Sequence, residues 1–129
     1  MFRFLLVENE DSLRDFYTEE LREEGYEIVS VANAQDALTK IKEENFHLAI
    51  VDIKMPGMDG LELLSRIVSE KRRIPVIINT AYPRYKDDFM SWAADAYVVK
   101  SSDLSELKDA VRKVLARYYG ENEVEREKR

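Results

Sequence analysis

The stretch LAIVDIKMPGMDGLELL at residues 48–64 is the most informative part of the chain for the fold. Its first four residues, Leu48–Val51, are all apolar and predict a short strand that is buried on both faces. Asp52 ends this strand, and a turn-rich loop containing proline and glycine follows at residues 55–60. The stretch therefore brings a carboxylate to the end of a buried strand.

A helix is expected directly after this loop. Asp59 and Glu62 are three residues apart, which is the spacing of a capping box at a helix N-terminus. Leu61, Leu64 and Val68 recur at helical spacing and form the predicted buried face of this helix. A buried strand that leads into an amphipathic helix is the repeating unit of an α/β domain.

The same alternation continues in both directions along the chain. Further strands are predicted at residues 4–7, 26–31, 75–78 and 97–99. Helices are predicted at residues 11–24, after the N-cap Asn33, at residues 84–93, and after Asp103, which has Glu106 as its capping partner. The apolar faces of the second and last helices consist of Ala34, Ala37, Leu38 and Ile41, and of Leu104, Leu107, Val111, Val114, Leu115 and Tyr118. Such a chain forms a doubly wound, five-stranded parallel sheet in a three-layer αβα sandwich.

Length and composition restrict the domain organisation and the compartment. The chain has 129 residues, which suits one domain. We place this domain at residues 1–118 and a charged C-terminal tail, expected to be solvated or frayed, at residues 119–129. No apolar run approaches the ~20 residues that a membrane span needs, so we expect a cytoplasmic protein without a membrane partner.

The residue counts also exclude several kinds of chemistry. The chain has no cysteine, which rules out disulfides and thiolate metal sites. Its net charge of −6 argues against direct binding to nucleic acid. The four glycines cannot form the glycine-rich loops that hold nucleotide phosphates. The only histidine, His47, cannot build a histidine metal site alone and is expected in a surface loop before a strand.

Polar residues follow four of the five predicted strands. Glu8 and Asn9 follow the first strand, Asp52 ends the third, Thr80 ends the fourth and Lys100 ends the fifth. Ligands of open parallel sheets bind outside the carboxyl ends of the strands, so these side chains are expected at one site. The alternative, in which Asp52 caps a turn and simply pairs with Lys100, does not explain why four strand ends agree.

This set of side chains suits phosphoryl transfer. A carboxylate buried at a strand end needs a cation, and a hard divalent ion such as Mg²⁺ prefers oxygen ligands from residues such as Glu8, Asn9 and Asp52. The metal and the Lys100 ammonium would neutralise the charge on a transferring phosphoryl group. Asp52 would be the nucleophile that forms an aspartyl phosphate, and Thr80 would hydrogen-bond a phosphoryl oxygen.

The chain resembles the receiver domains of two-component response regulators over residues ~2–118. The resemblance is carried by four motifs: LLVENE at 5–10, LAIVDIKMPGMDGLELL at 48–64, PVIINTA at 75–81 and AYVVK at 96–100. It implies a flavodoxin-like fold with strand order 2-1-3-4-5. The chain is similar to the single-domain receivers of chemotaxis and sporulation relays. The resemblance implies that it is not a classical enzyme and catalyses only its own phosphorylation and dephosphorylation.

The resemblance also implies roles for individual residues. Asp52 matches the phosphoacceptor, which a sensor histidine kinase or a phosphotransfer protein would phosphorylate with Mg²⁺ as cofactor. Lys54 would offer its backbone carbonyl to the metal, beside Glu8 and Asn9. Thr80 and Tyr97 match the switch hydroxyl and the switch aromatic, and Lys100 matches the phosphate-pairing lysine. The output surface would be the face made by the fourth helix, fifth strand and fifth helix.

Four features of this chain depart from the family pattern. Asn9 stands where the family usually has Asp, which predicts weaker metal binding. Ser101 stands where a proline after a cis bond is common, so the Lys100–Ser101 bond is left open as cis or trans. The 20 residues from Thr80 to Lys100 are two fewer than expected. In this family, the positions that Lys54 and Tyr82 occupy flank the path of the attacking water, so a long cation and an aromatic ring there are expected to slow dephosphorylation.

Three functions remain open from the sequence. The first is a stand-alone receiver that signals by protein–protein contact, as a monomer or a weak phosphorylation-dependent homodimer, to an unidentified downstream protein. The second is a receiver-like interaction module that is poorly phosphorylated because of Asn9. The third is an aspartyl-nucleophile phosphatase of the haloacid-dehalogenase type, but such enzymes need a second Asp at the position of Lys54.

Overall fold

A computed structural model describes residues 1–53, 58–70, 74–83 and 93–127. Five strands form one sheet in the order β2-β1-β3-β4-β5, and every neighbouring pair is parallel. The strands are β1 Arg3–Val7, β2 Glu27–Val31, β3 Leu48–Val51, β4 Val76–Thr80 and β5 Ala96–Val99. This topology confirms the predicted fold.

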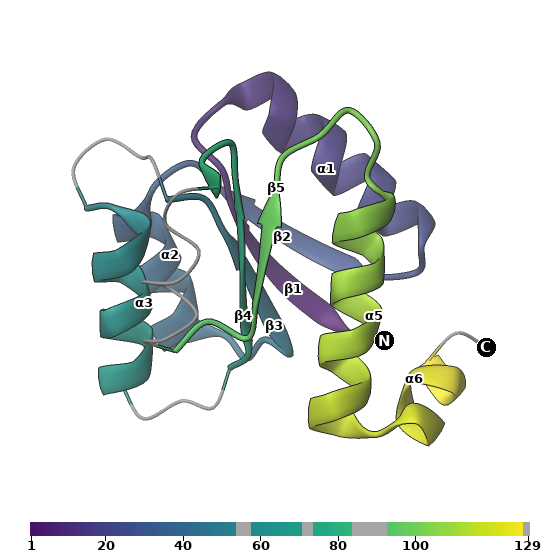
Figure 1. The fold of residues 1–129 in the computed structure, drawn as a ribbon. Helices are drawn as coiled ribbons and strands as arrows, with labels where there is room; N and C mark the ends of the chain where they lie inside the picture. The colour runs from purple at the N-terminus through teal and green to yellow at the C-terminus, as the bar shows by residue number, and fades with distance from the viewer. Residues whose placement is uncertain (54–57, 71–73, 84–92, 128–129) are drawn as a thin grey trace.

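Helices cover both faces of the sheet (Figure 1). They are α1 Asp11–Glu23, α2 Ala34–Glu43, α3 Gly60–Ser69, α5 Ser105–Tyr119 and α6 Glu121–Glu127. One apolar core packs α2 and α3 on the sheet, and a second packs α1 and α5 on the opposite face. The expected helix at residues 84–93 falls, except for its last residue, outside the described residues.

The helix N-termini at Asn33 and Asp59 form as predicted. The Asn33 side chain accepts a hydrogen bond from the Asp36 backbone N–H at 2.8 Å. The Asp59 side chain accepts one from the Glu62 N–H at 2.9 Å. Each bond satisfies a backbone donor that the first helical turn leaves without an intrahelical partner.

The predicted buried face of α3 is only partly right. Leu64 is buried, but Leu61 and Val68 are 37% and 47% exposed. The inner face is set by Gly60, whose missing side chain lets the helix approach the backbone of Asp52. Positions three, four and seven residues after Gly60 therefore face the sheet, and these are Leu63, Leu64 and Ile67.

The start of α5 also differs from the prediction. Leu104 occupies the N-cap, and Asp103 lies one residue earlier, where its carboxylate accepts a hydrogen bond from the Ser105 N–H at 2.9 Å. Glu106 therefore lies in the first turn and is not three residues from the cap. Tyr118, expected on the buried face, is 45% exposed, whereas Leu107, Val111, Val114 and Leu115 are buried.

The end of the described chain is folded, contrary to the expectation of a solvated or frayed tail. Residues 121–127 form α6, and Val124 is only 7% exposed because it packs in the same core as α5. Gly120, with φ of 88°, makes the turn between the two helices. The domain boundary at residue 118 stays a prediction.

His47 is half-buried and does not lie simply on the surface. Its ring contacts the rings of Phe2 and Tyr119 at centroid distances of 5.0 and 5.4 Å. Its Nδ1 accepts a hydrogen bond from the Arg3 N–H at 3.0 Å. The residue therefore links β1, the loop before β3 and α5 at the end of the sheet opposite the predicted site.

Candidate functional site

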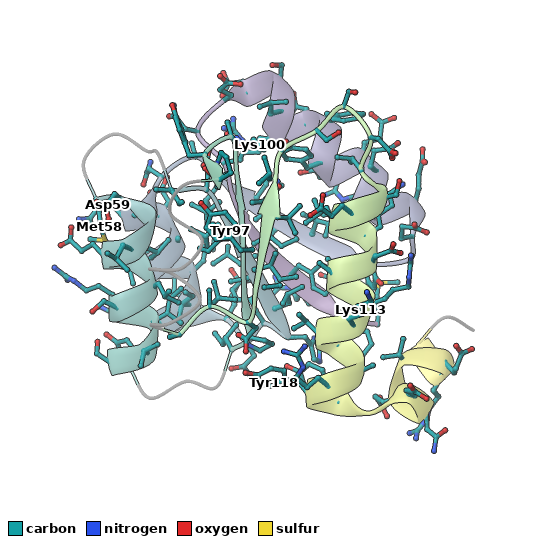
Figure 2. The ribbon with its side chains drawn as sticks, in the orientation of Figure 1. Met58, Asp59, Tyr97, Lys100, Lys113 and Tyr118 are labelled. Carbon is teal, nitrogen blue, oxygen red and sulfur yellow. The ribbon has the colours of Figure 1, made fainter. Side chains whose placement is uncertain are left out.

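The predicted site residues gather at the carboxyl edge of the sheet. Val7 of β1 pairs with Val51 of β3, so the next residues, Glu8 and Asp52, lie side by side. Lys100 follows β5 directly, and Figure 2 shows it at the end of that strand. Alternation along the three strands puts these side chains on the sheet face that α1 and α5 cover.

Lys100 joins the two carboxylates into one cluster. Its Nζ lies 2.8 Å from an Asp52 carboxylate oxygen and 2.7 Å from a Glu8 oxygen. The side chains of Lys100, Asp52 and Glu8 are 15%, 9% and 2% exposed. Burial favours the neutral amine, but the hydrogen bonds to Asp52 and Glu8 outweigh this and raise the pKa of Lys100 above its usual value.

The cluster keeps one excess negative charge. Two carboxylates and one ammonium sum to −1, and the second Glu8 oxygen accepts a hydrogen bond from the Glu10 N–H at 3.0 Å. Burying carboxylate charge is unfavourable, so a cation that approaches these oxygens is stabilised there. The arrangement is therefore chemically suited to a hard metal ion.

A cleft opens above the cluster. Its volume is about 260 Å³, which is small enough for an ion and a phosphoryl-sized group. The residues that line it are Glu8, Asn9, Glu10, Asp52, Ala81, Tyr82 and Lys100. The structure thus brings four of the predicted residues, Glu8, Asn9, Asp52 and Lys100, to a single cleft.

The oxygen donors of the cleft fit Mg²⁺. Glu8 and Asp52 contribute carboxylates and Asn9 contributes an amide oxygen, which are the ligand types that hard cations prefer. Among the described residues, no group of three or more Asp, Glu, His or Cys side chains is arranged for a metal. Lys54, the expected carbonyl ligand, lies outside the described residues.

Thr80 lies just behind the cleft. Its side chain is fully buried, and its hydroxyl oxygen accepts a hydrogen bond from the Tyr82 N–H at 3.4 Å. Its backbone carbonyl accepts one from the Lys100 N–H at 2.7 Å. Ala81 and Tyr82 form the cleft wall at this strand end. The predicted hydroxyl is therefore close to the cleft without lining it.

Tyr97 lies in the core beneath the same wall. It is 9% exposed, it belongs to the core under α2 and α3, and Figure 2 shows it midway along β5. Its hydroxyl donates a hydrogen bond to the Tyr82 carbonyl. Tyr97 therefore adopts the inward position in this structure and connects β5 to the segment after Thr80.

The loop after Lys100 has a trans backbone. No cis peptide bond occurs within the described residues, which include Lys100 and Ser101. This answers the question that the sequence left open at Ser101. The Ser101 hydroxyl accepts a hydrogen bond from the Asp103 N–H at 3.2 Å, which orders the turn between β5 and α5.

Sequence reasoning missed two buried polar residues beside the cluster. Asn79 of β4 is 4% exposed and Tyr17 of α1 is 2% exposed. The signal was the amide within the apolar run VIIN, at residues 76–79. An amide inside a fully buried strand needs a hydrogen-bond partner, and the sequence alone does not identify that partner.

Comparison with known proteins identifies the class. Residues 4–112 match the model of the response regulator receiver domain. The chain belongs to this family: it is a receiver domain of two-component signal transduction and not a classical enzyme. The predicted family membership is thus confirmed.

Two curated relatives match most of the chain. The two-component response regulator PhoP of Pseudomonas aeruginosa is 33% identical over 120 residues, which cover 92% of this chain and 53% of the relative. The sporulation initiation phosphotransferase F of Bacillus subtilis is 34% identical over 115 residues, which cover 88% of this chain and 93% of the relative. The chain thus spans about half of the first relative and nearly all of the second.

Solved structures of a third relative have the same fold. The response regulator TrrA of Thermotoga maritima, in complex with Mg²⁺–BeF, has a TM-score of 0.85 and 47% identity, covering 89% of this chain and 100% of that chain. TrrA in complex with the histidine kinase ThkA has a TM-score of 0.82, covering 89% of this chain and 99% of that chain.

No helix of the described residues has the length and apolarity to cross a bilayer.

Proposed function

We propose that this chain is a stand-alone receiver that accepts a phosphoryl group on Asp52. The donor is the phosphohistidine of a sensor histidine kinase or a phosphotransfer protein, and the reaction depends on Mg²⁺. The observation that supports this most strongly is the Lys100 ammonium, 2.8 Å from Asp52 and 2.7 Å from Glu8 at the mouth of a small cleft. The relative TrrA, with 47% identity, was solved with Mg²⁺–BeF and with a histidine kinase.

The transfer uses the side chains of the cleft. An oxygen of Asp52 attacks phosphorus, the new O–P bond forms as the P–N bond of the phosphohistidine breaks, and the electron pair returns to the imidazole. Lys100 stays beside the phosphorylated carboxylate and neutralises charge on the phosphoryl oxygens. Mg²⁺, held by Glu8, Asn9, Asp52 and the Lys54 carbonyl, would supply the remaining positive charge.

Output begins at the wall formed by Ala81 and Tyr82. Thr80 is one residue from this wall, and Tyr97 hydrogen-bonds the Tyr82 carbonyl. Movement of Thr80 toward the phosphoryl group would alter this contact and so remodel the face made by β5, α5 and the helix expected from the sequence at residues 84–93. A downstream protein would read that face in the cytoplasm, through protein contact and without nucleic acid or membrane. The chain would act as a monomer or a weak phosphorylation-dependent homodimer.

A second candidate is a receiver-like interaction module that takes up little phosphate. Asn9 is the observation that favours it, because an amide binds Mg²⁺ more weakly than a carboxylate does. Lys100 already pairs with both carboxylates, so the fold holds them together before any metal binds. The two candidates differ in whether saturating Mg²⁺ and phosphodonor modify Asp52.

Phosphotransfer assays separate the candidates. Three proteins are incubated with candidate phosphorylated kinases and with a small acyl phosphate: the wild type, Asp52→Asn and the control Asp36→Asn. The control removes an exposed carboxylate on α2. We expect Mg²⁺-dependent label on the wild type and on the control, and none on Asp52→Asn. Equal labelling of Asp52→Asn, or no labelling of the wild type at saturating Mg²⁺, would contradict the proposal.

A further inference from the structure

The guanidinium of Arg14 lies over the loop that joins β1 to α1. Arg14 is the fourth residue of α1, and its Nη1 donates a hydrogen bond to the Glu8 carbonyl at 2.9 Å. The same nitrogen lies 3.5 Å from the Asn9 carbonyl. Its Nη2 lies 2.5 Å from an Asp11 carboxylate oxygen. One side chain thus links the first turn of α1 to the two loop residues that are proposed to bind Mg²⁺.

The Arg14 side chain is much more buried than the carboxylate with which it pairs. It is 18% exposed, whereas the Asp11 side chain is 87% exposed. An ion pair with so exposed a partner contributes little to stability, so it does not by itself hold the guanidinium in this place. A charged group that gives up most of its contact with water needs acceptors in the protein, and the loop carbonyls are these acceptors.

The other contacts of the loop hold Glu8 more firmly than Asn9. The Glu8 N–H donates to the Val31 carbonyl at 3.1 Å, and the Glu8 carboxylate accepts from the Glu10 N–H at 3.0 Å. Asn9 is exposed. Within the described residues, the N-cap Glu10 makes no side-chain hydrogen bond to the first turn of α1. Arg14 therefore adds the contact that reaches the Asn9 end of the loop.

Order in this loop matters because Asn9 is a weak ligand. Its amide oxygen is neutral, and Mg²⁺ demands nearly ideal ligand geometry. A ligand that is already held in its binding position loses less conformational freedom when the metal binds. Groups that only orient the ligands typically change metal affinity by about 10–100-fold. A side chain that fixes the backbone of Glu8 and Asn9 can therefore raise the affinity of the cleft without contacting the metal.

The charge of Arg14 has the opposite effect on metal binding. A guanidinium beside the site repels a divalent cation. Among the described residues, those that line the cleft do not include Arg14, so it is not placed to bind the phosphoryl group. If Arg14 acted through its charge alone, its loss would tighten Mg²⁺ binding. If it acts through the loop geometry, its loss weakens Mg²⁺ binding, so the sign of the change separates the two effects.

We propose that Arg14 is a positioning residue for Mg²⁺ binding at the cleft. Its guanidinium holds the carbonyls of Glu8 and Asn9, and so keeps the Glu8 carboxylate and the Asn9 amide directed into the cleft. This inference rests on the proposed Mg²⁺-dependent function. Arg14 acts through these two residues and is not itself a ligand, so its loss changes the metal affinity and not the identity of the phosphoacceptor.

The test measures Mg²⁺ binding by isothermal titration calorimetry, without a phosphodonor. Arg14→Met removes the donors and the charge, and we expect about tenfold weaker binding. Arg14→Lys keeps the charge but lacks the planar fork of donors, so we expect a smaller loss of affinity. The matched control is Arg22→Met, on the same helix, which removes a guanidinium that donates to the Ile28 carbonyl at 3.2 Å. It should leave the Mg²⁺ affinity unchanged.

Phosphorylation by a small acyl phosphate is then followed over a range of Mg²⁺ concentrations. For Arg14→Met, the concentration that gives half of the maximal rate should rise about tenfold. The rate at saturating Mg²⁺ should stay within about twofold of the wild type, because Asp52 and Lys100 are untouched. Urea unfolding without Mg²⁺ shows whether Arg14→Met is folded. If it is not, Arg14→Lys decides, and wild-type Mg²⁺ affinity in that variant would overturn the inference.

The outcomes separate this inference from the proposed function. Equal or tighter Mg²⁺ binding by Arg14→Met would overturn the inference and leave the function intact. An equal loss of affinity in Arg22→Met would also overturn it, because it would indicate a general effect of α1. If the wild type binds Mg²⁺ but takes up no phosphate, the proposed function fails, while the affinities of the variants still decide the inference. A wild type that binds no Mg²⁺ would contradict both.

Discussion

Lys100 is the residue on which the charge balance of the site depends. Its ammonium contacts Asp52 and Glu8, and all three side chains are largely buried. Without this ammonium, the two neighbouring carboxylates would repel each other. The residue therefore has a structural role, which holds the carboxylates together, and a chemical role, which neutralises the phosphoryl group.

The variant Lys100→Met tests both roles. It leaves two buried carboxylates without their cation, so we expect a loss of about 2–3 kcal/mol in the free energy of unfolding near neutral pH. Phosphorylation should fall by about a hundredfold, the scale seen when a preorganised charge is removed. Urea titration and labelling measure the two effects. The control Lys113→Met, at an exposed position on α5, should change neither.

Gly60 matters because a side chain there has no room. An added Cβ would lie 2.6 Å from the Asp52 carbonyl oxygen and 2.8 Å from the Ile53 Cα, which are both backbone atoms. We expect Gly60→Ala to cost about 1–3 kcal/mol of stability and to slow phosphorylation by displacing Asp52. Thermal unfolding and labelling check this.

Gly25→Ala is the matched control for this change. Gly25 has φ of 94°, but a Cβ added there would meet no heavy atom within 4 Å, so its cost is conformational only. It should lose stability without slowing phosphorylation. An unaltered phosphorylation rate in Gly60→Ala would mean that contact between α3 and Asp52 does not position the acceptor.

At the scale of elements, Arg3 joins the start of β1 to β2 and to the end of α2. Its guanidinium pairs with Glu27 at 3.2 Å and with Glu44, and it lies 5.0 Å from the ring centre of Phe46. The hydrogen bond from Arg3 lowers the pKa of Glu44, and Lys40 adds to this. A carboxyl group whose pKa is lower in the folded than in the unfolded protein stabilises the fold at a pH above its unfolded pKa. This contribution is lost as the pH falls through the folded pKa.

The variant Glu44→Gln should therefore be less stable than the wild type near neutral pH. As the pH falls through the lowered pKa of Glu44, the wild type loses this contribution and the difference between the two proteins should shrink. Urea midpoints at about pH 7 and about pH 3 measure it. A difference that stays constant or grows at acid pH would show that the ion pair does not stabilise the fold.

Helix α6 extends the core beyond the end of α5. Val124 is 7% exposed and packs in the core that contains Phe2 and Val114. We expect Val124→Ala to cost about 1–2 kcal/mol, from the buried methyl groups that are lost. The control Val68→Ala, at a position 47% exposed on α3, should cost less than about 0.5 kcal/mol. Equal losses in thermal unfolding would contradict the packing of α6.

For the whole molecule, the sequence predicted the sheet and its carboxyl edge because both follow from local patterns. Apolar runs marked the strands, and the polar residues at the ends of four of them were expected at one edge of the sheet. What could not be predicted depends on contacts between distant segments. A single apolar residue, Val124, is too weak a local signal for α6, and the partners of His47 lie on other elements.

The helix faces show the same limit at a finer scale. The spacing of Leu61, Leu64 and Val68 fits a helix, but the run also contains Leu63 and Ile67 at helical spacing. Gly60 decides between the two faces, because only the second lets the helix lie against the Asp52 backbone. Periodicity identified the helix, and tertiary packing selected its buried side.

The most direct test of the whole account is to locate the phosphoryl group. The wild type is incubated with Mg²⁺ and a small acyl phosphate, the acyl phosphate on the protein is trapped by reduction, and the modified peptide is sequenced by mass spectrometry. The account predicts modification at Asp52 alone, and only when Mg²⁺ is present. Modification at another residue, or none under saturating conditions, would contradict it.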